Sequence, residues 1–554
     1  MAQTVYRGNL SAQTFPLRSD IQAQTVMVAR NDGTAFTQEQ YQRDSGVPQV
    51  MYCHNVMPTL RGYQSVSYRQ KYEAYPSPLD VEQYVRSVLT FPDGSGTLVH
   101  LVVDQEDAYT TEESINPDPP GGVSTSSWRK RINQFPGHFN FGTPEVAYVN
   151  GVAYFGPFGG ADRWYTFDGG TDSFVPVTFT GLAIASGAGI LSTNGVMVVW
   201  DDVAIGWSSN VDPTDFTPSL ATGAGGGNVQ EIKGRIVNCV GVSWGFIIFG
   251  NFNAVAAIYT GNLRYPYTFK EIQNCGGLIG SIANKMATKY QKDDVCYAFT
   301  TRGFQQISQK EAKMVNADMN DFFSGKVLED YNRADGFPSQ QIYTTGIQGL
   351  DRAVAMIADR YLCVSYGVNF TGDGDEFNPT KSWEYSHVLV WDTALNRWGK
   401  LRHAHADLFE METRDTTDEG SDAPDRNRNS MAFLRWNGVV DLLDFTFDDI
   451  EENDGNSILI LGRYQVERGN VCTLEEVQFE NVDPATDMRV FDGYTLDGRN
   501  VVEYKEGYDL LPGATGYTRR YAFHQPGVNH AVIVSGRFNL TDIILTMKAQ
   551  AGRR

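Results

Sequence analysis

Two stretches of similar sequence decide the fold: FDGGTDSFVPV at residues 167–177 and WDTALNRWGKL at residues 391–401. They align without gaps. Each has an aromatic residue, an aspartate, a short turn, a second aromatic residue six positions after the aspartate, and an aliphatic residue further on. An aspartate side chain can accept hydrogen bonds from the backbone of a turn, so each copy indicates two strands joined by a capped turn.

This spacing resembles the outer hairpin of a kelch-type propeller blade, in which the aspartate caps the turn and the second aromatic residue packs between blades. From Ala147 to Phe447 the sequence repeats an order of short apolar strand, turn and strand. Asn150-Gly151 is a strong hairpin signal, because both central residues of a type I′ turn need positive φ. The sequence therefore predicts an all-β fold with an irregular β-propeller core. Two copies do not define a strict period, and a generic β-sandwich is the alternative.

Turn signals and composition shifts divide the chain into three parts. Residues 1–140 are expected to form a β-rich N-terminal region that is part of a docking platform and contains a Pro- and Gly-rich loop or linker at 116–122. Residues 141–455 are the expected propeller core with acidic loop insertions. Residues 456–554 are expected to form a C-terminal β-sandwich or barrel, because apolar strands alternate there with Asp-Gly and Pro-Gly turns.

Composition narrows the classes of function. The 554 residues carry a formal charge of −21, which argues against a tight nucleic-acid clamp, since such a clamp shows a basic stripe. Six scattered cysteines without a Cys-x-x-Cys pair favour reduced thiols. The N-terminus lacks an apolar signal core, and the most apolar window, 245–259, is too short to span a bilayer. We expect a soluble protein made in a cytoplasm, without stable membrane insertion.

Three motifs look catalytic at first reading. Residues 241–245 read GVSWG, the Gly-x-Ser-x-Gly pattern of a nucleophile elbow, but a strand and not a helix follows, so a hairpin is predicted. The glycine run at 223–227 has no Gly-Lys-Ser/Thr after it and is interpreted as a flexible or closely approached loop, not a phosphate loop. The aromatic residues between 259 and 269 are interpreted as packing residues. We expect no enzyme activity and no cofactor.

His403, His405 and Asp407 alternate along one predicted strand and form the best metal candidate of the chain. A structural histidine pair is the favoured interpretation, and a pH-sensitive contact is a further option. Asp373-Gly374-Asp375-Glu376 lacks the full spacing of a calcium loop.

Acidic side chains concentrate in two segments, 410–425 and 441–454, which we interpret as solvated loops or as lining at a channel or its tip. The residues proposed for that lining are Glu410, Glu412, Asp415, Asp418, Glu419, Asp448, Asp449, Glu451 and Glu452.

Three further segments carry a resemblance to a known family. They are VMPTLRGYQSV at 56–66, the block at 207–277 that contains DPTDF, and NHAVIVSGRF at 529–538. Their order resembles the tail hub or nozzle proteins of short-tailed bacteriophages. Because that family is structural, the resemblance carries over no catalytic residues.

The resemblance implies a virion tail protein that is made in the host bacterial cytoplasm and assembles into a hexameric ring. Such a ring docks to the adaptor of the head-to-tail connector above and to tail fibres or spikes outside. It forms a channel that retains packaged DNA and releases it during ejection, with transient, non-specific contact. An acidic wall fits that role, because it repels phosphate. The alternative is a propeller-type tail protein that binds or hydrolyses glycans, whose site would lie at the mouth of the propeller.

Overall fold

The computed structural model is all-β, and its strands pair antiparallel in every named sheet. It describes residues 3–9, 50–59, 62–72, 87–92, 98–103, 108–112, 127–130, 145–158, 163–168, 173–184, 188–285, 294–315, 329–330, 343–344, 353–358, 360–366, 385–394, 397–413, 428–435, 439–444, 457–464, 471–480, 488–495, 503–511 and 518–549. None of these described residues belongs to a helix long and apolar enough to cross a membrane.

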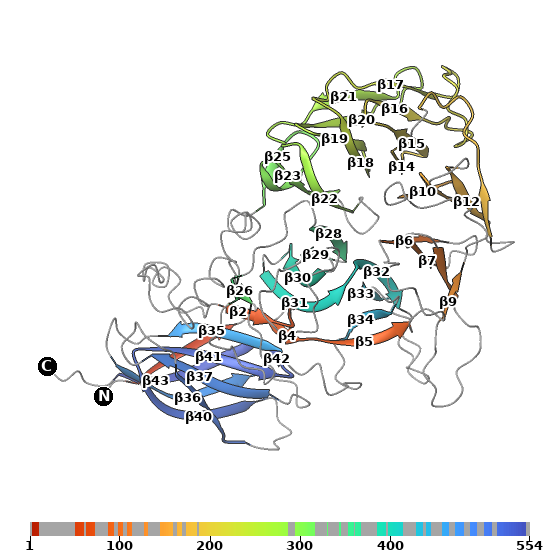
Figure 1. Ribbon diagram of the computed structural model, residues 1–554. Coiled ribbons are helices and arrows are strands. Elements are labelled where there is room, and N and C mark those ends of the chain that lie inside the picture. Colours follow the sequence, from red (N-terminus) through yellow and green to blue (C-terminus); the bar gives the residue numbers. More distant parts are fainter. Residues whose placement is uncertain are drawn as a thin grey trace.

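Six four-stranded sheets and the first four strands of a seven-stranded sheet form the seven blades of a propeller in the described chain (Figure 1). Each of the first four blades uses four consecutive strands. Blade 1 contains β6 (Ser87–Pro92), β7 (Leu98–Val103), β8 (Ala108–Glu112) and β9 (Ser127–Lys130). Blade 2 contains β10 (Glu145–Val149), β11 (Val152–Gly156), β12 (Tyr165–Asp168) and β13 (Ser173–Pro176). Blade 3 contains β14 (Gly189–Thr193), β15 (Val196–Trp200), β16 (Ala204–Trp207) and β17 (Gly225–Asn228). Blade 4 contains β18 (Ile236–Val242), β19 (Gly245–Gly250), β20 (Ala254–Tyr259) and β21 (Tyr267–Glu271).

Blades 5 and 6 are also built from four consecutive strands, whereas blade 7 takes one strand from elsewhere in the sequence. Blade 5 contains β22 (Leu278–Lys285), β23 (Val295–Thr300), β24 (Gly303–Ile307) and β25 (Ala312–Met314). Blade 6 contains β28 (Val354–Ala358), β29 (Tyr361–Tyr366), β30 (Tyr385–Asp392) and β31 (Arg397–His405). Blade 7 contains β32 (Asp407–Thr413), β33 (Arg428–Leu434) and β34 (Val440–Asp444), and its fourth strand is β5 (Ser67–Tyr72) from the N-terminal part of the chain. A small hairpin of β26 (Glu329–Asp330) and β27 (Tyr343–Thr344) lies between blades 5 and 6 in sequence.

The innermost strands close a ring. They contact each other in the order β6, β10, β14, β18, β22, β28 and β32, and β32 contacts β6 again. In Figure 1 the orange strand β5 lies beside β34 at the outer edge of the last blade. The N-terminal strand therefore completes the blade that the C-terminal end of the propeller begins.

Apolar side chains fill the gaps between neighbouring blades. Blades 2 and 3, for example, share the cluster of Trp164, Phe179, Met197 and Phe216, while blades 7 and 1 share Val102, Phe409 and Met411. Separate clusters join blades 1 to 2, 3 to 4, 4 to 5 and 6 to 7, and the largest cluster joins blades 5 and 6 to the sandwich. Burial of these faces supplies the main driving force for closing the ring.

Both ends of the chain build the second body, a sandwich of two five-stranded sheets (Figure 1, blue and red). One sheet has the order β1 (Gln3–Asn9), β43 (Asp542–Ala549), β36 (Cys472–Glu480), β40 (Arg519–Gly527) and β39 (Tyr508–Asp509). The other has the order β2 (Val50–His54), β35 (Ile458–Tyr464), β41 (Asn529–Gly536), β37 (Met488–Thr495) and β38 (Glu503–Glu506).

These pairings correct the expected division of the first 140 residues. That region is not a unit of its own: β1 and β2 belong to the sandwich, and β5 to β9 belong to the propeller. The sandwich likewise extends beyond residues 456–554, because each of its sheets has an N-terminal edge strand. The all-β propeller-type core itself is confirmed.

The two similar stretches of sequence occupy equivalent places. Residues 167–177 span the pairing of β12 with β13, and residues 391–401 span the pairing of β30 with β31; both are the hairpin of the third and fourth strands of a blade. Asp392 Oδ1 accepts a hydrogen bond from the Ala394 backbone N–H at 3.1 Å, which is the capping role expected of this aspartate. At Asn150-Gly151 both φ angles are positive, as the predicted turn requires.

The segment with the DPTDF sequence fastens blade 3 to blade 2. It follows β16, and its Thr214 carbonyl accepts a hydrogen bond from Thr180 N at 2.9 Å, while Phe216 N donates to the Thr180 carbonyl at 2.8 Å. Phe216 is 2% exposed and lies 5.3 Å from Phe179, centroid to centroid. The segment therefore works as an interblade clasp.

Replacing Phe216 by alanine should lower the free energy of unfolding by about 3 kcal/mol, because it leaves a cavity between blades 2 and 3. Equilibrium denaturation followed by tryptophan fluorescence measures this loss. Val211→Ala in the same segment is the matched control: Val211 is 75% exposed, so its truncation should change stability by less than about 0.5 kcal/mol. Equal effects of the two substitutions would contradict the clasp.

Candidate functional site: the junction between propeller and sandwich

The sheet of blade 6 continues out of the propeller. Its outer strand β31 pairs with β3 (Val56–Pro58), which pairs with β4 (Tyr63–Ser65), which pairs with β42 (Asn539–Leu540) from the C-terminal part of the chain. The result is one seven-stranded sheet that reaches from the propeller to the sandwich.

Two of the three segments that carry the family resemblance meet in this junction. Ser65 N donates a hydrogen bond to the Phe538 carbonyl at 2.8 Å, and Phe538 N donates to Ser65 Oγ at 2.8 Å. Both residues are buried. Segments 56–66 and 529–538, separated by more than 450 residues of sequence, are therefore adjacent in space.

Glycines allow the strands of the junction to come this close. A Cβ at Gly62 would lie 1.9 Å from the Leu540 carbonyl oxygen, and a Cβ at Gly399 would lie 2.4 Å from the Val56 carbonyl oxygen. Both obstacles are backbone atoms, which cannot rotate away. Only glycine fits at these two positions without moving a strand.

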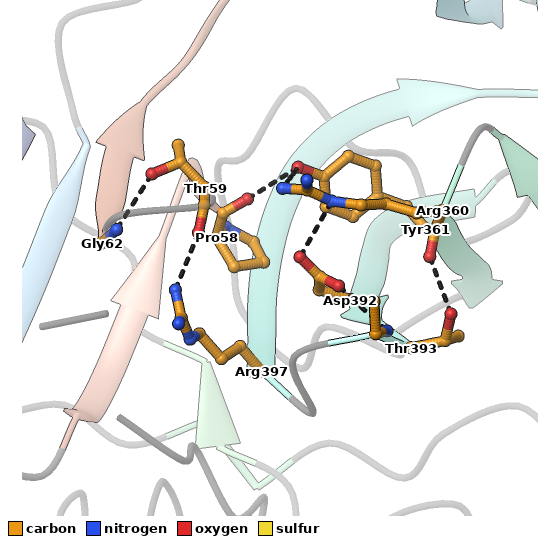
Figure 2. A network of polar contacts seen from close by, with 9 residues as sticks. Pro58, Thr59, Gly62, Arg360, Tyr361, Asp392, Thr393 and Arg397 are labelled. Carbon is orange, nitrogen blue, oxygen red and sulfur yellow. Dashed lines mark hydrogen bonds and ion pairs between the residues drawn. The ribbon is translucent and has the colours of Figure 1, made fainter. Parts of the chain in front are cut away.

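A polar network holds the turn of blade 6 against β3 (Figure 2). Arg360 Nε lies 3.0 Å from Asp392 Oδ2 in an ion pair whose carboxylate is fully buried. The guanidinium also lies over the Tyr361 ring, 4.9 Å from its centroid, and its Nη2 donates to Tyr361 Oη at 2.8 Å. Thr393 Oγ1 donates to the Arg360 carbonyl at 3.0 Å.

The same network reaches the N-terminal segment through its backbone. Tyr361 Oη donates to the Pro58 carbonyl at 2.8 Å, and Arg397 Nη1 donates to the Thr59 carbonyl at 2.7 Å (Figure 2). Burial of Arg397 lowers its pKa from the usual value, although the group stays charged because an arginine pKa starts above 12. The arrangement positions backbone carbonyls and has the character of a mechanical joint.

A buried ion pair lies in the sandwich just beyond the junction. His530 Nδ1 is 2.8 Å from Asp492 Oδ2, and His530 Nε2 is 3.2 Å from the Cys472 carbonyl oxygen. Both partners of the imidazole are acceptors, so both ring nitrogens carry protons. Burial alone would lower the pKa of His530, but the hydrogen bonds to Asp492 and Cys472 outweigh it and raise the pKa to about 10.

The structure assigns the three metal candidates to different partners. His403 Nε2 contacts Asp441 Oδ2 at 2.9 Å, and Arg435 pairs with the same carboxylate. His405 lies between Ser365 Oγ, 2.8 Å from its Nε2, and the His403 carbonyl, 2.7 Å from its Nδ1, and burial lowers its pKa to about 3. Within the described residues, no group of three or more metal-ligating side chains converges.

The third candidate, Asp407, joins the first blade to the last. Its Oδ2 accepts a hydrogen bond from Val88 N of β6 at 2.8 Å, and burial raises its pKa to about 6. Sequence reasoning missed an equivalent residue, Glu145 on β10, whose Oε2 accepts from Ile190 N of β14 at 3.0 Å. Burial raises the pKa of Glu145 to about 8. Both carboxylates begin an innermost strand and bind the backbone of the next blade; only the start of an apolar strand marked them in the sequence.

Most of the acidic residues proposed as channel lining lie outside the described residues: Asp415, Asp418, Glu419, Asp448, Asp449, Glu451 and Glu452. The same holds for the segment 373–376. Glu410 and Glu412 lie on β32, the innermost strand of blade 7. This strand is one of the inner strands that form the ring. Whether Glu410 and Glu412 line a lumen stays a prediction.

The catalytic-looking motifs lie in a hairpin, on a packed strand and on an edge strand. Ser243 and Trp244 are the two turn residues between β18 and β19, which confirms the predicted hairpin, and Ser243 Oγ donates to Asp294 Oδ2 at 2.6 Å. Tyr267 is buried against Trp207 and Phe246, as expected of a packing residue, but Tyr265 is 63% exposed, so the packing interpretation is wrong for it. The glycine run was interpreted as a loop, but residues 225–228 form the edge strand β17.

Comparison with known proteins yields no relative that names a function. No protein-family model and no curated protein matches the sequence. Among solved structures, YCF48 bound to a D1 peptide is similar with a TM-score of 0.35 and 11% identity, over 70% of this chain and 98% of that one. A eukaryotic initiation factor is similar with a TM-score of 0.27 and 8% identity, over 70% of this chain and 95% of that one. TM-scores this low carry no argument about the fold, so the assignment of a propeller rests on the strand pairing described above.

Gly62→Ala should loosen the junction, because the added methyl overlaps the Leu540 carbonyl and forces β42 away from β4. We expect a loss of about 1–3 kcal/mol, typical of overpacking, and faster amide exchange at Gln64 and Asn539 in hydrogen-exchange mass spectrometry. Gly206→Ala in blade 3 is the control, since its Cβ would meet side chains only at 3.5 Å or more. Unchanged exchange at the junction would show that β4 and β42 are not held in this register.

Asp492→Asn should destabilise the protein by about 3–5 kcal/mol near neutral pH, because it leaves the buried imidazolium without its counter-charge. In the wild type the raised pKa of His530 contributes stability that is fully present below about pH 6.5 and lost as pH rises towards 10. The variant should lack this part of the pH dependence. Thermal midpoints of both proteins between pH 6 and 10 measure it; parallel curves would show that His530 is neutral in the folded protein.

Proposed function

We propose that this chain is a structural subunit of the tail of a short-tailed bacteriophage, and that copies of it form the nozzle ring through which DNA leaves the virion. The observation that carries the proposal is the junction. Two of the three family-like segments, 56–66 and 529–538, build one joint that ties the propeller to the sandwich through a continuous sheet. A likeness in the residues of such a joint favours a protein that works by holding its bodies in place.

The way the chain ends are used supports the same role. The N-terminal part contributes strands to the sandwich, the junction and blade 7. A force that acts on one of these three parts is therefore distributed over the other two. Backbone pairing at several places resists separation better than a single linker, which leaves domains free to move. A subunit of a channel under pressure needs this kind of cross-tie.

The charge of the chain fits a channel through which DNA slides. Each copy carries a formal charge of −21, and a ring multiplies that charge by the number of copies. Phosphate groups are repelled by such a wall and find no basic stripe to hold them. The adaptor above the ring, and fibres or spikes outside it, are the partners that this role requires.

Electron microscopy of the purified full-length protein tests the proposal. We expect rings of about six copies with an axial hole, the symmetry that the resemblance implies and a closed form that head-to-tail contacts can generate, and gold-labelled antibodies should mark the tails of intact virions. A protein that stays monomeric at micromolar concentration and is absent from virions would contradict it.

A further inference from the structure

The outermost strand of blade 3 presents a nearly bare backbone. β17 has the sequence GGGN; Gly226, Gly227 and Asn228 are exposed, and Gly225 is half-buried. On one side it pairs with β16, and among the described residues no strand pairs with its other side. An exposed edge of this kind offers unpaired N–H and C=O groups to another extended chain.

The other blades protect their outer edges. Proteins blunt such edges with charged side chains, proline or a covering segment. β13 has a proline, β9, β21, β25 and β5 carry lysine or arginine, and β31 is covered by β3. Within the described chain, β17 is thus the blade edge without such protection.

Packing inside blade 3 explains only part of the glycine run. A Cβ at Gly225 would lie 3.2 Å from the Trp207 ring, and a Cβ at Gly226 would lie 2.5 Å from the Ile205 carbonyl oxygen. At Gly227 a Cβ would meet nothing within 4 Å. The space beside the strand is open there, and the φ of +158° at Gly227 also favours glycine, so the run combines close packing and backbone conformation with an edge free of side chains.

Exposed apolar side chains flank this bare edge. The turn of blade 4 that contains Leu263 and Tyr265 touches the loop leading into β17, since a Cβ at Gly223 would lie 3.1 Å from Leu263 Cδ2. Leu263 is 39% exposed, Tyr265 63%, and Leu220 in the same loop 69%. Arg264 lies over the Tyr265 ring and adds a positive charge to the rim.

The sandwich carries a segment with the opposite character. Tyr508 in the edge strand β39, and Leu510 and Leu511 just after it, are 74%, 39% and 37% exposed. β39 pairs with β40 on one side and ends its sheet on the other. Asp509 gives this segment a negative charge, with its Oδ1 accepting from Leu511 N at 2.8 Å. Tyr508 and Asp509 are extended, Leu510 and Leu511 form a bend, and the apolar side chains of this edge protrude.

We propose that the apolar edge at 508–511 of one copy adds to the glycine edge β17 of the next copy. The side chains missing from β17 make room for those of the incoming segment, and Leu220, Leu263 and Tyr265 receive them. Arg264 and Asp509 have complementary charges. The two edges belong to bodies at opposite ends of the molecule in Figure 1, the top of the propeller and the bottom of the sandwich near β40. The contact is therefore head-to-tail, the kind that closes into a ring.

This contact deepens the proposed function, because it names the interface between the copies of the ring. Asn228→Lys tests it: Asn228 is exposed, so the fold tolerates the change, while a lysine blocks strand addition. Mass photometry should show that the concentration needed for half-assembly rises about tenfold or more. Val175→Lys on the outer strand β13 of blade 2, where Val175 is 44% exposed, adds the same charge to an edge that the interface does not use, and should assemble like the wild type.

Disulfide trapping tests the pairing itself. The six native cysteines are buried, so a mixture of Asn228→Cys protein and Tyr508→Cys protein should give a cross-linked dimer under mild oxidation, and the double variant should give a ladder up to the full ring. Neither single variant alone should cross-link above the background of a Val175→Cys variant, whose cysteine lies outside the proposed interface.

The outcomes separate the two proposals. Rings that form equally well from Asn228→Lys protein, without cross-links between the two engineered positions, overturn the interface and leave the nozzle in place. Cross-linked assemblies of another symmetry, such as open filaments, support the interface and contradict the six-fold nozzle. A wild-type protein that never assembles contradicts both.

Discussion

Closure of the ring of inner strands is the constraint on which the rest of the structure depends. Once β32 lies against β6, blade 7 needs a fourth strand at its outer edge, and β5 from residues 67–72 supplies it. That one pairing brings the N-terminal part of the chain to the end of the propeller. Because β3 and β4 precede β5 closely in sequence, they are placed beside blade 6, and β2 is placed at the edge of the sandwich. The composite sandwich follows from the closure.

Polar groups at the seams serve the same closure. Asp407 and Glu145 each cross from one innermost strand to the backbone of the next, and the Arg360–Asp392 pair fastens the turn of blade 6 beside β3. Buried carboxylates of this kind are costly unless they accept hydrogen bonds, so their value lies more in specifying register than in raw stability. Apolar clusters between blades drive assembly, while the carboxylates select which strand ends meet. This division of work explains why Asp407 and Glu145, two buried carboxylates with raised pKa values, lie where neighbouring blades meet.

The sequence predicted what is local and missed what is distant. The Asn150-Gly151 turn, the hairpin at Ser243 and the cap at Asp392 depend on residues within a few positions of each other, and all three are present. The expected boundary at residue 140 was wrong because the pairing of β5 with β34 joins residues nearly 370 positions apart, which no local pattern reveals. The glycine run was misinterpreted for a related reason, because glycines usually mark turns. Here residues 225–228 pair with the distant strand β16, and the Ile205 carbonyl comes so close to Gly226 that a side chain does not fit. The histidines of 403–405 alternate as predicted, but their partners Asp441 and Ser365 come from other strands.

The order in which these contacts can form has a consequence for assembly. β5 cannot pair until β34 near residue 440 exists, and β4 cannot pair with β42 until residue 539 exists. The pairing of β5 with β34, the junction and the sandwich all require C-terminal residues. Blades 2 to 5, whose strands are consecutive, can therefore form before the ring closes. The glycine edge β17 and the apolar edge beside β39 then differ in timing: the first is complete early in synthesis, while the second belongs to a sandwich that forms last. The proposed head-to-tail contact between them would therefore form only once one of the two copies is complete, and the growth of the proposed ring would depend on finished subunits.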